Sequence, residues 1–128
     1  MEGEAMNITS EQAYNSLVRK NIELQSAVEE LIGLAHRKAD ATAHYEKQLS
    51  VHILTLRDSG TSATLSEKIA KGELDKEKLE MMLAEELLKI QYVKIDAIKS
   101  HISSYQSIIN GRRAEMQAML IENNQKEK

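Results

Sequence analysis

The sequence contains no cysteine, proline, phenylalanine or tryptophan, and its only aromatic residues are four tyrosines. Without cysteine, the chain can form neither a disulfide framework nor a zinc knuckle, and it offers no thiol nucleophile. This composition fits a reducing compartment. Without proline, nothing forces a long helix to kink or stop. Because aromatic residues are so few, the interior has to be built mainly from Leu, Ile, Val, Met and Ala.

Long apolar runs are also missing. No segment approaches the roughly 20 apolar residues that a membrane span needs, and residues 1–8 lack the basic region and apolar run of a secretion signal. We therefore expect a soluble cytoplasmic protein with no membrane partner. Acidic and basic residues are interspersed and the net charge is −3. Non-specific nucleic-acid binding usually requires a surplus of positive charge, so a DNA-coating role is disfavoured.

Two long stretches carry apolar residues at alternating steps of three and four, which is typical of helices that pack lengthwise. They run from about residue 10 to 58 and from about 74 to 124. Thr9 and Gln12 have the spacing of a capping box, which predicts the start of the first helix. The first apolar ladder begins with Tyr14, Leu17, Asn21, Leu24 and Val28. We expect residues 10–124 to form one domain, between a flexible N-terminus (1–9) and a frayed tail (125–128).

A break in the pattern separates the two long helices. Gly60 can adopt the left-handed conformation that ends a helix. Thr61 or Ser62 can cap a short helix over residues 62–71, which carries Leu65 and Ile69, and Gly72 is placed to end it. The sequence therefore predicts a short helix at the turn.

Two glycines interrupt otherwise continuous helical patterns. Gly33 and Gly111 each cost a helix about 1 kcal/mol relative to alanine, and both are expected as tolerated interior residues or gentle kinks. For Asn110 followed by Gly111, a true helix end is the alternative, which would make residues 112–124 a separate arm.

The second long helix has more apolar surface than one partner helix can cover. Its surplus stripe consists of Leu79, Leu83, Leu87 and Ile90. The expected fold is all-α: a long, coiled-coil-like antiparallel helical hairpin with a short helix at its turn. We expect this stripe to be an oligomer interface that completes a four-helix arrangement in a homodimer. A monomeric three-helix protein is the alternative.

His36, Asp40 and His44 stand four residues apart, a spacing that can present metal ligands on one helix face. Their phase relative to the apolar ladder places them on the solvent side, so solvated surface residues are expected. No nucleophile motif or phosphate-binding glycine loop is found. We expect no catalytic residue, no metal site and no cofactor, and hence no enzyme.

Two surfaces remain as candidate binding sites for a protein partner. Folding the long helices about the turn is expected to bring Arg19 and Lys20 level with Arg112 and Arg113, which makes a basic open end. The turn itself is the second candidate, because exposed loops carry function disproportionately. Ordinary solvated charges are the alternative reading of both. The candidate turn residues are Arg57, Gly60, Thr64, Lys68 and Lys71.

The turn resembles that of a family of small helical proteins encoded by phages and prophages. The shared pattern is Leu-x-x-x-Gly-x-x-Ala-Thr, here from Leu56 to Thr64, followed by an Ala-Lys-Gly stop at residues 70–72. The resemblance covers roughly residues 45–115, and Ser62 stands where proline is frequent. It implies a phage origin, the host-cell cytoplasm as location and a role exercised by binding, without family catalytic residues to carry over.

The expected function is therefore that of a non-enzymatic phage protein that binds another protein. The partner would be a host defence or housekeeping factor, or a component of an early recombination module. The alternatives are an accessory that binds nucleic acid through the basic open end, and a structural coiled-coil component. The nucleic-acid accessory would bind with an affinity that falls steeply as the salt concentration rises. The structural component would assemble into open-ended oligomers and not into a closed dimer.

Overall fold

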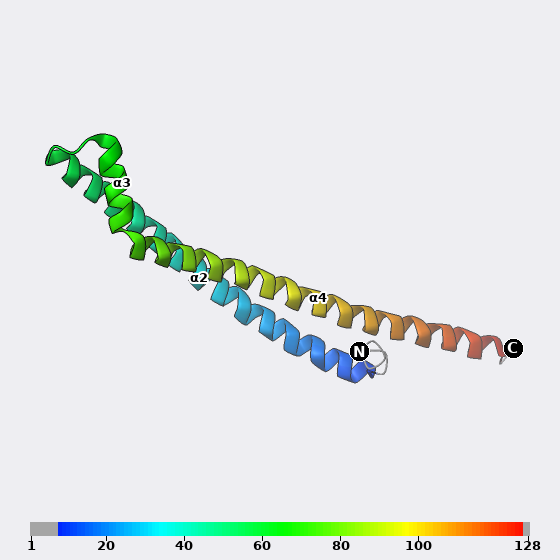
Figure 1. Ribbon diagram of the computed structural model, residues 1–128. Coiled ribbons are helices and arrows are strands. Elements are labelled where there is room, and N and C mark those ends of the chain that lie inside the picture. Colours follow the sequence, from blue (N-terminus) through cyan, green and yellow to red (C-terminus); the bar gives the residue numbers. More distant parts are fainter. Residues whose placement is uncertain (1–7, 127–128) are drawn as a thin grey trace. The chain divides into compact units, whose positions relative to one another are not determined.

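The computed structural model describes residues 8–126, which form three α-helices and no strands (Figure 1). These are α2 (Ser10–Asp58), α3 (Ala63–Glu73) and α4 (Asp75–Lys126). The all-α prediction of two long helices around a short one is confirmed. Gln125 and Lys126 still belong to α4. The expectations for residues 1–7 and 127–128 lie outside the described part of the chain.

A reciprocal capping box begins α2, as the sequence predicts. The backbone N–H of Gln12 donates to Oγ1 of Thr9 over 3.1 Å, and the Thr9 N–H donates to Oε1 of Gln12 over 3.0 Å. These two bonds satisfy backbone donors that have no carbonyl partner at a helix N-terminus.

Gly60 ends α2 in the left-handed conformation, with a φ of 94°. Its N–H donates to the carbonyl of Arg57, and the N–H of Thr61 donates to the carbonyl of Leu56. This pair of bonds is a Schellman motif, which satisfies carbonyls left open at the helix end and reverses the chain. The sequence prediction for Gly60 is confirmed.

The short helix α3 starts at the predicted cap but runs further than predicted. Oγ of Ser62 accepts a hydrogen bond from the N–H of Leu65. Gly72 lies inside the helix, which continues to Glu73 and meets α4 at the buried Leu74. Glycine ends a helix only where the following residues leave the helical path. Here the buried Leu74 holds the chain at the junction, so the helix continues past Gly72.

The helices form two compact units. Of the described residues, the first unit combines 8–28 with 94–126, and the second comprises 29–93. Within the first, α2 and α4 pack against each other around Ala13, Ala27, Ile95, Ile98 and Ile102. None of the helices in residues 8–126 contains an apolar stretch long enough to cross a membrane.

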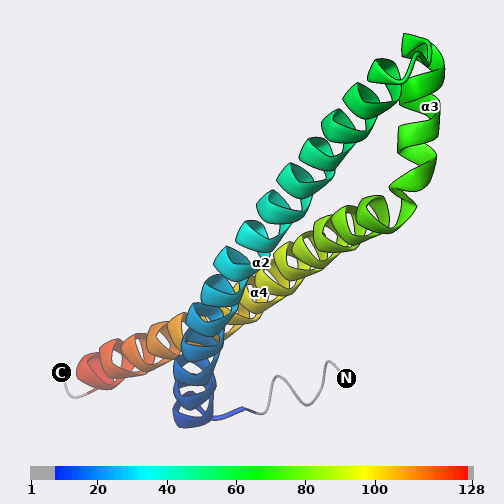
Figure 2. The ribbon, with the colours of Figure 1, turned by 90° about the vertical axis from the view of Figure 1, so that its left-hand side faces the viewer.

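The second unit contains the end of α2, the whole of α3 and the start of α4. Its chain reverses at Gly60, so α2 and α4 run in opposite directions (Figure 2). The buried side chains include Tyr45, Ala70, Leu74 and Ala84. Gln91 is buried as well, at 5% exposure, and its amide donates to Oε2 of Glu30 over 3.3 Å. This bond satisfies a polar group inside the interface, as burial requires.

The first apolar ladder is one position out of phase at its start. Ala13 and Ala27 are buried, whereas Tyr14 and Val28 are 59% and 40% exposed. Alanine lets two helices approach closely, and a heptad drifts against the 3.6-residue turn of a straight helix. In α4, the ladder residues Ile95, Ile98 and Ile102 are buried as expected.

Both interior glycines are helical. α2 continues through Gly33 and α4 continues through Gly111. The alternative in which Asn110 and Gly111 end the helix is therefore wrong. Gly111 has no bond of the kind that closes α2 at Gly60, because its backbone stays in the helical ladder.

Replacing Gly60 by alanine should destabilise the fold, because a side chain at a left-handed φ costs about 1–2 kcal/mol. Gly33→Ala is the matched control: nothing lies within 4 Å of the added methyl group, and alanine in a helix interior gains roughly 0.5–1 kcal/mol over glycine. Urea unfolding followed by circular dichroism measures both free energies of unfolding. Equal effects of the two substitutions would contradict the assigned turn.

Candidate functional site

The predicted turn residues lie on α3 and the last turn of α2. Thr64, Lys68 and Lys71, together with Glu67, line a shallow hollow of about 200 Å³. Arg57 lies in the last turn of α2 and is exposed, and Gly60 shapes the backbone. We call Arg57, Thr64, Leu65, Lys68 and Lys71 the turn surface.

Leu65 was not singled out as a binding residue. Its spacing from Ile69 suggests a packing face, but Ser66 and Ala70 are the buried residues of α3, and Leu65 is 50% exposed. Small side chains let α3 lie close to its neighbours, which turns the larger Leu65 outwards. The sequence offered one signal for this exposure. Leu65 lies three residues after the cap Ser62, in the first turn of the helix, where other side chains seldom cover a residue completely.

Charges on α3 are partly neutralised. Nζ of Lys71 lies 2.9 Å from Oε1 of Glu67. The hydrogen bond from Lys71, and secondly its charge, lower the pKa of Glu67 below its ordinary value. The same contacts raise the pKa of Lys71. Within residues 8–126 no carboxylate pairs with Lys68 in this way, so Lys68 presents its charge to solvent.

A contact between helices holds the far end of α3. Nδ1 of His52 on α2 lies 3.1 Å from Oε2 of Glu73, the last residue of α3. The Schellman turn and the Ser62 cap hold the near end. The turn surface is therefore attached to α2 at both ends of α3.

In the part of the chain that the structure describes, residues of the expected basic open end line separate hollows. Arg19 and Lys20 line one of about 230 Å³ beside Tyr105. Arg113 lines another of about 440 Å³, with Tyr14 and Ile109 among its neighbours. Arg19 therefore shares a hollow with Tyr105, and Arg112 lines neither of the two hollows.

Two of these cations already have partners. Nζ of Lys20 lies 3.0 Å from a carboxylate oxygen of Glu23. The guanidinium of Arg112 donates to the backbone carbonyl of Ile8. Arg112 therefore contacts the segment just before α2, eleven residues or about three helical turns ahead of Arg19. The sequence prediction assumed that the chain reverses in the middle of the turn segment. The chain instead reverses at Gly60, before α3, so the residues of α4 that lie level with a given residue of α2 differ from those expected.

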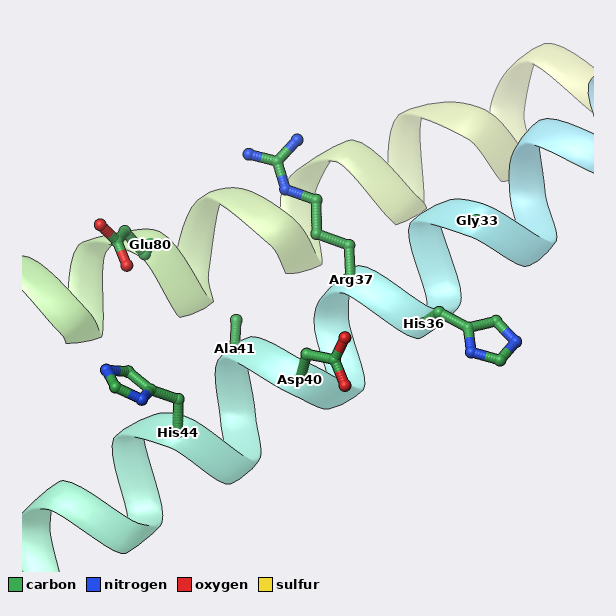
Figure 3. Close-up of a pocket in the computed structure, with 7 residues that line it drawn as sticks. All are labelled: Gly33, His36, Arg37, Asp40, Ala41, His44 and Glu80. Carbon is green, nitrogen blue, oxygen red and sulfur yellow. The ribbon is translucent and has the colours of Figure 1, made fainter.

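His36, Asp40 and His44 line a hollow of about 590 Å³ on α2, with Arg37 and Glu80 beside them. Figure 3 shows the two imidazole rings pointing away from each other, with Asp40 between them. In residues 8–126, no three histidine or carboxylate side chains come together to hold a metal ion. All three residues are exposed, as expected from their phase.

The expected oligomer stripe lies on the first part of α4. Leu79, Leu83, Leu87 and Ile90 are all exposed in the single chain. Met82 and Val93, which the sequence reading left out of the stripe, are exposed beside them. The interior of the second unit therefore leaves this side of α4 uncovered.

Comparison with known proteins yields no match: no family model, no curated protein and no solved structure is similar to this chain.

Replacing Lys71 by glutamine should raise the pKa of Glu67 towards its ordinary value of 4.5. Because the pKa is lowered in the folded state, the pair stabilises the fold above the ordinary pKa, and this contribution disappears as the pH falls through the lowered value. An NMR titration of the Glu67 side-chain carboxyl measures the shift. Lys68→Gln is the control and should leave the titration unchanged; equal curves for the two variants would contradict the pairing.

Proposed function

We propose that this chain is a non-enzymatic protein that acts by binding another protein through the turn surface. The observation that carries the proposal is a half-exposed leucine next to a cation, Leu65 and Lys68, on the outer side of α3, where no carboxylate of residues 8–126 pairs with Lys68. Burial of the leucine against a partner would contribute apolar stabilisation, and the neighbouring charge would favour a partner surface of opposite sign.

The attachment of α3 supports this proposal. A binding surface that is already ordered loses little conformational entropy when the partner docks, so more of the contact energy appears as affinity. The Schellman turn holds one end of α3 and the His52–Glu73 contact holds the other. A partner segment that offers an apolar side chain and a carboxylate would match Leu65 and Lys68.

The resemblance of the turn to phage proteins suggests which partners to test. They are a host defence or housekeeping factor, and a component of a recombination module. The nucleic-acid alternative has less support, because Lys20 is paired with Glu23 and Arg112 is bonded to a backbone carbonyl. Without a continuous row of available cations, few phosphates can be neutralised at once.

We also propose that the chain forms a homodimer through the exposed stripe of α4. Exposed apolar side chains at helical spacing favour burial against another helix. A closed dimer would leave the turn surface available on each copy.

Capture of a partner by the tagged protein tests the proposed function. The wild-type chain should retain one protein at near-stoichiometric yield after nuclease treatment, and the double substitution Leu65→Asp, Lys68→Glu should reduce the yield at least about tenfold, as expected for loss of an interface anchor. Quantitative mass spectrometry of the captured material measures the yield.

The matched control is Lys99→Glu, which reverses the charge of an exposed lysine of α4 that does not belong to the turn surface. It should retain the partner at the wild-type level. Unchanged capture by the double variant would refute the role of the turn surface. Recovery that depends on intact nucleic acid would favour the accessory function instead.

A further inference from the structure

The exposed stripe of α4 is longer than the interface expected from the sequence. Its side chains are 37% to 69% exposed and recur at steps of three and four residues, with one adjacent pair, which places them on one side of the helix. Nothing in residues 8–126 covers this side. The stripe consists of Leu79, Met82, Leu83, Leu87, Ile90 and Val93.

We infer that this stripe pairs with the same stripe of a second copy in antiparallel orientation, with Leu87 at the centre. The inference rests on the proposed self-association and adds its interface, orientation and register. The occupant is a second copy because the stripe is complementary to itself in both its apolar side chains and its charges.

The apolar side chains match in this register. Leu87 meets Leu87 of the second copy at the two-fold axis. Leu83 lies within one residue, about 1.5 Å along the axis, of the level of Ile90 of the other copy, and Met82 lies within one residue of the level of Val93. Each of these pairs occurs twice, because an interface between identical copies about a two-fold axis uses the same patch on both. The register therefore buries the stripe from Met82 to Val93 and leaves Leu79 outside the paired part.

The charges beside the stripe distinguish the two orientations. Glu86 and Lys89 lie between its apolar residues, are mostly exposed, and approach each other to 3.3 Å within one copy. Antiparallel pairing places Glu86 within one residue of the level of Lys89 of the other copy, on both sides of the axis. Parallel pairing would place each residue level with its own copy, so that like charges meet. Like charges at facing positions destabilise paired helices, so the antiparallel orientation is favoured.

The pairing has a consequence for the turn surface. α3 directly precedes α4 in the chain. With Leu87 at the centre, the first residues of the two α4 helices lie 24 residues apart along the pair, roughly 36 Å at 1.5 Å per residue, so the two α3 helices lie at its opposite ends. A dimer would present two turn surfaces, and binding to a partner with two sites would gain from effective concentration.

Single cysteines test the orientation without interference, because the natural chain has none. We would mix Leu83→Cys chains with Ile90→Cys chains that carry a distinguishable tag, oxidise them, and quantify disulfide-linked species by mass spectrometry. The mixture should form at least about tenfold more disulfide between unlike chains than either variant forms alone, because the two copies of one position lie roughly 9–12 Å apart along the helix, beyond disulfide reach. Leu87→Cys alone should link readily.

Self-association itself is measured by analytical ultracentrifugation of the full chain. Leu87→Glu should convert the dimer to a monomer with unchanged helix content by circular dichroism. Ile32→Glu is the matched control, since Ile32 is similarly exposed but lies on α2; it should leave the dimer intact.

Three results would overturn the inference. The wild-type chain could be a monomer, or Leu83→Cys chains could link to each other in preference to Ile90→Cys chains. The third is a dimer that Ile32→Glu dissociates and Leu87→Glu leaves intact. None of these readouts involves the partner protein. Failure of the dimer and failure of the turn surface can therefore be told apart.

Discussion

The left-handed backbone at Gly60 is the constraint on which the rest of the structure depends. It closes the end of α2 and reverses the chain, so it determines which residues of the returning helices lie level with which residues of α2. In the second unit, the contacts between Glu30 and Gln91 and between His52 and Glu73 are both centred near this turn. A turn one helical step later would pair different residues throughout the unit.

The interior is thin, and this explains why so much apolar surface remains outside. Its buried apolar side chains in residues 8–126 are four alanines, three isoleucines, one leucine and one tyrosine. Small side chains bring two helices close together but bury little area. Larger side chains next to this seam, such as Leu65 and Leu87, then face outwards. The same packing that holds the helices together therefore creates the surfaces on which both proposals rest.

Local signals of the sequence were reliable where a few adjacent residues decide the outcome. The capping box at Thr9, the turn at Gly60 and the cap at Ser62 form as predicted, because each satisfies backbone groups within one helical turn. Gly72 and Gly111 were ambiguous by the same reasoning. Both glycines lie inside helices. The residues that follow decide this outcome, namely the buried Leu74 after Gly72 and the continuing helix after Gly111, and the glycine alone does not reveal it.

By itself, the sequence determined that the chain is helical, where its long helices begin and reverse, and which side of α4 carries surplus apolar residues. These follow from spacing and from local hydrogen bonds. Only the tertiary structure decided that Arg112 lies level with Ile8 and not with Arg19, and that Leu65 faces outwards while Ser66 is buried. Register and exposure depend on how closely helices distant in sequence approach, and that distance is set by all the side chains between them.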